Sequence, residues 1–298
     1  MKHFRPILLL TLLLLSTVLV RAQITRDQIQ VTTPTAPWTL VFDGKNLSLR
    51  DVKIKATEGS GYFLMLDNEN QVNFSLYIEP VDKCKSSESC RDYILAQGNP
   101  AWGKYQDLAK GKVGDFSYFE FYRPEVQAQP VKMLDMYAQY VDKGYWIDLH
   151  ISKVLYKKED HALFENLIKG IKFVPKGSQA SGSDAEMAKV DAAATNWLKL
   201  WDATNCKETY SSLTSFFREA VTEQQWTPFC QGVQKDLGKL KSRTLVASSL
   251  MKSLPPKPEL SGAMFAYRSV FEKTSVVELM TFARAADGKW TVLNYMPK

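Results

Sequence analysis

Apolar and polar residues alternate along the first half of the chain. Every second residue is apolar in three runs, which comprise Val72, Phe74, Leu76 and Ile78, then Leu134, Met136, Ala138 and Tyr140, and then Ile147, Leu149 and Ile151. Such alternation is typical of strands with one buried face. Residues 89–97 and 160–173 break the alternation, and their spacing predicts helices. We therefore predict that residues 23–175 form an α+β domain in which an antiparallel sheet has flanking helices.

The second half of the chain has the opposite order of elements. Apolar residues first recur at spacings of three and four, at Met187, Val190, Ala194, Trp197, Leu198 and Trp201. This spacing predicts a helix, and two further helices are predicted at residues 207–218 and 222–237. The period then changes to two, which predicts strands at residues 240–251, 263–271, 276–284 and 290–295. Residues 184–298 should therefore form helices packed on a curved, four-stranded antiparallel meander.

A small polar run, residues 176–183, separates the two halves, and its glycine and serine content predicts a flexible linker. The chain has 298 residues, of which 45% are hydrophobic and 23% charged, so we expect it to fold. At about 100–200 residues per domain, this length fits two domains.

Residues 1–22 have the features of a signal peptide. Lys2 and Arg5 precede an apolar run at residues 7–20, and Ala22 ends the motif that a signal peptidase recognises. As a helix this run spans about 21 Å, less than the roughly 30 Å of a hydrocarbon core. We predict cleavage near Ala22 and a soluble mature protein, periplasmic or secreted, with no transmembrane segment. The alternative is that the run stays uncleaved as an anchor.

The net charge of +6 comes partly from this segment. Its three basic residues have no acidic counterpart, so the remaining chain carries a net charge of +3, with −1 on residues 23–175 and +4 on residues 176–298. Lys239, Lys241 and Arg243 fall on one face of a predicted strand, where we expect solvated side chains. No nucleic acid is expected as a partner, because the chain has no recognised nucleic-acid-binding motif.

The four cysteines form one potential pair in each predicted domain. Cys84 is close to Cys90 in the sequence, and Cys206 is close to Cys230. Because an exported protein meets an oxidising compartment, we predict two structural disulfides with this pairing. The alternative, a thiol nucleophile or a zinc site, lacks C-x-x-C spacing, and we predict neither a metal nor a cofactor.

Histidine offers little for catalysis. His150 shares a strand face with Asp148 and Ser152, but side chains two apart on a strand are parallel and about 6.5–7 Å apart, too far for a catalytic triad. We interpret the three residues as part of a polar sheet face. His161, at the start of a predicted helix, is expected to be solvated. No catalytic residue is assigned.

The second domain supplies the candidates for a binding cleft. Helices over a curved sheet often leave a cleft at its open end. The candidates to line it are Trp197, Trp226, Tyr267, Arg268 and Glu278. The alternative is that the aromatic members fill a hydrophobic core, and strand faces alone do not show that the polar members converge.

Several segments of the second half resemble a known family. Four segments are similar to the bacterial domain of unknown function numbered four-zero-one-nine. They are the run Thr222-Glu223-Gln224-Gln225-Trp226, residues 237–243, the triplet Ser253-Leu254-Pro255 and the run from Asp287 to Trp290. The resemblance covers about residues 188–296, although Gln234 stands where many members carry arginine. It implies a cystatin-like or nuclear-transport-factor-like fold and a secreted bacterial protein, but no activity.

The first half resembles the PsbP and LpqN-like superfamily. The resemblance rests on the order of elements and on the strand Tyr145-Trp146-Ile147-Asp148 followed by an amphipathic helix. It implies an extracytoplasmic scaffold that binds proteins.

These observations favour a non-enzymatic binding or interaction protein of the cell envelope. Its partner would be an envelope protein, a peptide or a small ligand. One alternative is a small-molecule enzyme that uses the cleft of the second domain, and another is a structural spacer.

Overall fold

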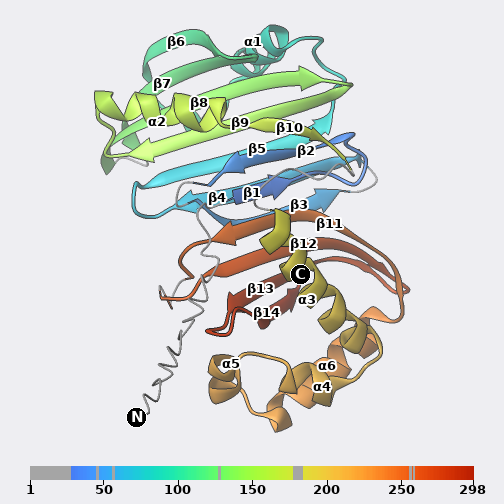
Figure 1. The fold of residues 1–298 in the computed structure, drawn as a ribbon. Coiled ribbons are helices and arrows are strands. Elements are labelled where there is room, and N and C mark those ends of the chain that lie inside the picture. Colours follow the sequence, from blue (N-terminus) through green and yellow to red (C-terminus); the bar gives the residue numbers. More distant parts are fainter. Residues whose placement is uncertain are drawn as a thin grey trace, which may run out of the picture.

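The computed structural model describes residues 28–44, 47–55, 58–126, 129–176, 184–254, 257 and 259–298. The predicted signal peptide and residues 177–183 of the predicted linker lie outside them. The described residues form two antiparallel seven-stranded sheets, A and B, with helices beside them (Figure 1). The prediction of a mixed helix and sheet protein is therefore confirmed.

Sheet B is built entirely from the first half of the chain, in the order β3-β4-β5-β9-β8-β7-β6. Its strands are β3 (Ser48–Lys55), β4 (Ser60–Asp67), β5 (Val72–Pro80), β6 (Gln106–Val113), β7 (Phe116–Val126), β8 (Gln129–Asp142) and β9 (Tyr145–Val154). The three alternating runs of the sequence lie on β5, β8 and β9. Their apolar side chains all face one core, so the alternation reports burial on one side of the sheet.

Sheet A joins strands from both sides of the predicted linker, in the order β10-β2-β1-β11-β12-β13-β14. Its strands are β1 (Gln28–Val31), β2 (Trp38–Asp43), β10 (Lys172–Pro175), β11 (Leu240–Met251), β12 (Gly262–Phe271), β13 (Ser275–Arg284) and β14 (Trp290–Pro297). Strand β1 pairs with β11, with Gln30 opposite Ser248. The predicted meander β11–β14 is present, but the expectation of a four-stranded sheet is wrong, because β1, β2 and β10 extend it. The predicted domain limits stay a prediction.

One hydrophobic core lies between the two sheets. It combines side chains of β1 and β2, such as Ile29 and Leu40, with the apolar faces of β5, β8 and β9. Val246, Ala266 and Val277 of the meander belong to the same core, and β3 contacts β11, β12 and β13. The two halves of the chain are therefore held together by shared packing as well as by a shared sheet.

Among the described residues, two helices and the two 3-10 turns η2 and η3 accompany sheet B. They are α1 (Ser87–Gln97), η2 (Pro100–Trp102), η3 (Lys158–Asp160) and α2 (His161–Lys169). Helix α2 buries Phe164, Leu167 and Ile168 in the core between the sheets. Helix α1 contacts β7 and β8, and the nearby Trp102 packs on Phe119 and Phe121 in a separate aromatic cluster.

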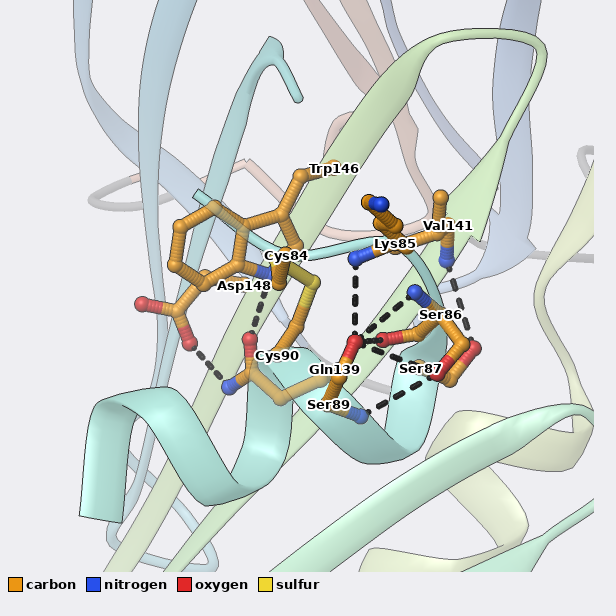
Figure 2. The surroundings of a disulfide bond; sticks show 10 residues. All are labelled: Cys84, Lys85, Ser86, Ser87, Ser89, Cys90, Gln139, Val141, Trp146 and Asp148. Carbon is orange, nitrogen blue, oxygen red and sulfur yellow. Dashed lines mark hydrogen bonds between the residues drawn. A yellow bond between two sulfur atoms is a disulfide. The ribbon is translucent and has the colours of Figure 1, made fainter. Parts of the chain in front are cut away.

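The start of α1 is fixed by a disulfide and by a cap, as Figure 2 shows. Cys84 is bonded to Cys90, which ties the first turns of α1 to the segment after β5. The Ser86 and Ser89 side chains form a reciprocal capping box. This helix also begins two residues before the predicted range.

Four helices cover the face of sheet A that points away from sheet B. They are α3 (Asp184–Asp202), α4 (Cys206–Ser211), α5 (Ser215–Ala220) and α6 (Glu223–Leu237). Cys206 and Cys230 link α4 to α6, so both predicted disulfide pairings are present. Helices α4, α5 and α6 lie at the end of the molecule opposite α1 and β6 (Figure 1).

Two helix predictions need correction. The predicted helix at residues 160–173 ends at Lys169, and β10 follows after Gly170, because Phe173 and Val174 pair with β2. The predicted helix at residues 207–218 is two helices, α4 and α5. Thr214 separates them, since its side chain caps α5 while its amide donates to the Val292 carbonyl of β14.

Candidate functional site

A groove of about 530 Å³ lies between α3 and the edge strand β14. Its lining residues come from α3, from the residue after α4, from the turn before β14 and from the start of β14. They are Lys189, Ala192, Ala193, Asn196, Trp197, Leu200, Ser212, Gly288, Lys289, Trp290, Thr291 and Val292. A volume of this size falls within the range of about 300–1,000 Å³ that is common for small-ligand sites.

The two walls of the groove differ in kind. The residues that α3 contributes are spaced by three and four along the helix, so they form one helical face. By contrast, β14 and the turn before it contribute five consecutive residues, Gly288 to Val292. Because side chains alternate between the two faces of a strand, one row of side chains does not account for this wall. The groove therefore runs along the backbone edge of β14.

The chain itself closes one end of the groove. Leu213 forms a parallel bridge with Val292, and the Thr214 amide donates to the Val292 carbonyl at 2.9 Å. Ser212, which precedes this bridge, lines the groove, as do Trp197, Leu200 and Val292. Three of these four side chains are apolar, so this end of the lining is mostly apolar.

The other end of the groove carries charge. Lys189 is 2.7 Å from Glu186, whose second oxygen accepts a hydrogen bond from the Trp290 indole at 3.2 Å and lies 3.6 Å from Arg284. Burial alone would raise the pKa of Glu186, but the bonds from Lys189 and Trp290 and the charge of Arg284 hold that pKa below its ordinary value. Lys289 is largely exposed and 3.5 Å from Asp287. Three basic groups thus face two carboxylates at this end.

The aromatic candidates from the sequence lie in the core beneath the groove. Trp197, Trp226 and Tyr267 are each at least nine-tenths buried and pack in one cluster between the helices and sheet A. The Trp197 and Trp201 rings are stacked with centroids 5.5 Å apart. Of the five predicted cleft residues, Trp197 alone also lines the groove. Whether any of the five binds a ligand stays a prediction.

Glu278 is fully buried at the end of this aromatic core and is surrounded by donors. Arg243 donates to its two carboxylate oxygens at 2.6 and 3.0 Å, and the Ser269 hydroxyl donates as well. The Tyr295 hydroxyl donates at 2.5 Å. The carboxylate is therefore saturated by internal bonds, which is the pattern of a structural ion pair.

The expectation that Arg243 lies on a solvated face is wrong. Its side chain is 12% exposed and also donates two bonds to Asp202 of α3, at 2.7 and 2.9 Å. A register shift between Leu240 and Ser242 interrupts the alternation on which that expectation depended.

The polar candidates of the second half do not converge on a cavity. Tyr267 is paired across the strands with Glu278. The neighbouring Arg268 is on the opposite face of β12 and donates to the Ser269 carbonyl at 2.7 Å. The residues that line the groove include neither Tyr267, Arg268 nor Glu278.

A second polar cluster lies on the α1 side of sheet B. His150 is 2.8 Å from Asp135 of β8, and Arg123 holds that buried carboxylate with two bonds at 2.6 and 3.1 Å. The His150 ring also stacks on Tyr137, with centroids 4.3 Å apart. The carboxylate partner of His150 therefore comes from the neighbouring strand and not from Asp148.

Asp148 has a different partner. Gln139 donates to it at 2.6 Å and accepts a bond of 2.6 Å from the Trp146 indole (Figure 2). Burial raises the pKa of the Asp148 carboxyl. On the other face of the sheet, His161 is partly exposed, in line with the expectation of a solvated side chain, and it also has a carboxylate partner, Glu120, at 3.0 Å. Within the described ranges, no three or more His, Cys, Asp or Glu side chains gather in a way that could hold a metal ion.

Most of the groove was missed by the sequence analysis. The alanine run that includes Ala192 and Ala193 was a usable signal, because small side chains next to a tryptophan on a helix leave space beside it. The β14 wall gave no such signal, since it is defined by the edge position of the strand.

The second half of the chain matches a family model. Residues 193–295 match the family model described as Protein of unknown function (DUF4019). No curated protein matches the chain significantly. The family match confirms the resemblance of the second half to that family, and the family description names no activity.

Two solved structures are similar at low identity. The solution structure of cyanobacterial PsbP (CyanoP) from Synechocystis sp. PCC 6803 is 13% identical, with a TM-score of 0.36, over 51% of this chain and 94% of that chain. A crystal structure of a protein from Bacteroides thetaiotaomicron VPI-5482 is 9% identical, with a TM-score of 0.36, over 88% of this chain and 87% of that chain. Similarities this low assign no function.

Proposed function

We propose that the protein is a non-enzymatic binding protein and that its ligand lies in the groove between α3 and β14. The observation that carries this proposal is the shape of the groove, which has a helical wall, a strand-edge wall, an apolar closed end and a charged open end. A few polar groups on a mostly apolar lining are typical of ligand sites.

The proposal includes export. It assumes cleavage of the signal peptide near Ala22, a periplasmic or secreted mature protein, and an envelope protein, peptide or small ligand as partner. The two disulfides fit an oxidising compartment. Among the described residues, no helix combines the length and the apolar character needed to cross a bilayer. The PsbP-like and cystatin-like descriptions of the two halves, with limits at residues 175 and 184, remain part of the proposal.

A site-specific crosslink tests the groove. A photoreactive phenylalanine analogue is placed at residue 196, which lines the groove, and at residue 195 as the matched control, since Thr195 is an exposed neighbour on the same helix outside the lining. Irradiation of the source cells followed by mass spectrometry should give adducts at residue 196 and none at residue 195. Equal adducts at both positions, or none at either, would show that the groove is not a binding site.

The competing function, a small-molecule enzyme, has weaker support. It needs Glu278 and a nearby hydroxyl beside a space for substrate. Tyr295 does lie within hydrogen-bond distance of Glu278, but both side chains are buried and the groove lining includes neither. The geometry therefore favours binding over catalysis.

A further inference from the structure

Strand β14 offers a backbone edge along the groove. It is the last strand of sheet A, with β13 on its inner side. On its outer side, the residues that the structure describes pair with it only where Leu213 bridges Val292. That bridge is parallel and involves one residue of the connection between α4 and α5, so it shows that the outer edge of β14 can pair with backbone groups.

The direction of the neighbouring backbone groups follows from two hydrogen bonds. The Val292 carbonyl points outward, because it accepts from Thr214. Residues two apart on a strand point their N–H and C=O groups to the same side, so the backbone of Trp290 also points outward. Arg284, which is opposite Trp290 on β13, confirms this, since its amide donates to Ser261 on the side away from β14.

We propose that the groove binds an extended peptide segment with an acidic side chain, and that the segment pairs with the backbone of Trp290 as an added strand. This inference rests on the proposed function and specifies its ligand. Strand addition of this kind takes affinity from main-chain hydrogen bonds and specificity from the flanking side chains.

The two ends of the groove set the order of side chains in the peptide. At the closed end, Trp197, Leu200 and Val292 favour an apolar side chain. At the open end, Lys189 and Lys289 favour a carboxylate, because both lysine side chains are more than half exposed and the pair of Lys289 with Asp287 is exposed on both sides.

The length of the groove limits the size of the segment. From Trp290, where β14 begins, to Val292 the strand rises by about 7 Å, and from Lys189 to Leu200 the helix rises by about 16 Å. The helical wall therefore accommodates about five residues of extended chain, of which only the part beside Trp290 can pair with the strand. The occupant is a short linear segment and not a folded domain.

A library of synthetic pentapeptides tests the inference. Each peptide has glutamate fixed at one end and an apolar residue at the other, and both termini are blocked so that a side chain supplies the carboxylate. Binding to the full-length mature protein is measured by fluorescence anisotropy. We expect selected peptides to bind, to lose about tenfold in affinity when the central amide is N-methylated, and to lose about threefold when glutamate becomes glutamine.

Protein variants locate the peptide. Asn196→Trp fills the groove and should abolish binding, whereas Thr195→Trp on the neighbouring exposed position should leave it unchanged. Lys189→Ala combined with Lys289→Ala should weaken binding and reduce its dependence on salt. By NMR, the amide of Trp290 should exchange with solvent more slowly when peptide is bound.

The outcomes separate this inference from the function on which it rests. If no library member binds, or if N-methylated peptides bind as well as their parents, strand addition is wrong. If no library member binds but residue 196 crosslinks to a molecule that is not a peptide, the groove remains a binding site and only the peptide inference is wrong.

Discussion

The ion pair between Arg243 and Glu278 gives the sharpest test of the packing. We consider Arg243→Met, which keeps most of the volume of the side chain and removes its charge. Glu278 is fully buried, and the arginine supplies two of its hydrogen bonds, at 2.6 and 3.0 Å. Removing one partner of a buried ion pair typically costs about 3–5 kcal/mol, because the other charge stays buried without compensation.

The expected change is a fall of about 3–5 kcal/mol in the free energy of unfolding, measured by urea denaturation at neutral pH. Lys241→Met is the matched control, since Lys241 is an exposed residue on the same strand, and it should change stability by less than about 0.5 kcal/mol. Asp202, the other partner of Arg243, is more exposed and contributes less.

A double variant distinguishes the charge from the packing. Glu278→Gln keeps an acceptor for the Ser269 and Tyr295 hydroxyls but removes the negative charge. Arg243→Met with Glu278→Gln should therefore be more stable than Arg243→Met alone. If the single variant costs less than about 1 kcal/mol, or if the double variant is the less stable of the two, the assignment of a tightly coupled buried pair is wrong.

Three further predictions concern the pH dependence of stability and the two disulfides. Burial raises the pKa of Tyr137, so the folded state favours the neutral phenol. The stability that the phenol contributes below about pH 10 should therefore be lost as the pH rises further. Denaturation between about pH 9 and 11 should show a steeper loss of stability for the parent protein than for Tyr137→Phe, and the same pH dependence in both would contradict this prediction. Burial raises the pKa of Asp148, so the contribution of this carboxyl to stability is complete below about pH 4 and is lost as the pH rises. Asp148→Asn, which keeps the acceptor for Gln139, should therefore raise the melting temperature at pH 7 and not at pH 3. A lower melting temperature of this variant at pH 7 would refute the argument. Replacing Cys206 and Cys230 by serine opens a loop with a sequence separation of 24, and the chain-entropy model gives a loss of about 3.5 kcal/mol in the free energy of unfolding. The same replacement of Cys84 and Cys90 should cost about 2 kcal/mol, because that loop is shorter. Denaturation of the two double variants checks this order.

Local patterns predicted most of the individual elements. The alternation on β5, β8 and β9 and the spacing of three and four on α3 each report a face that is buried in the structure. What these patterns could not supply is the partner of a strand edge. Strand β1 pairs with β11 across more than half of the chain, and a pairing of this kind depends on backbone groups that every residue carries.

The same physical limit applies to the candidate site. Trp197 can be predicted from the sequence because a large aromatic residue on a helix is conspicuous there. Its burial in the core follows from its apolar surface, and the space beside it follows from the small neighbours Ala192 and Ala193. The wall formed by β14 is a property of strand order, so it could be recognised only once the sheet was known.

The pairing of β1 with β11 also sets a time order for folding. The first described strand leaves the ribosome long before its neighbour, because Gln30 and its partner Ser248 are far apart in the sequence. Strand β2 can join β1 early, but the far side of β1 stays unpaired until β11 has emerged. During synthesis the nascent chain thus presents an open strand edge for most of its length, which is the kind of surface that invites incorrect pairing or the help of a chaperone.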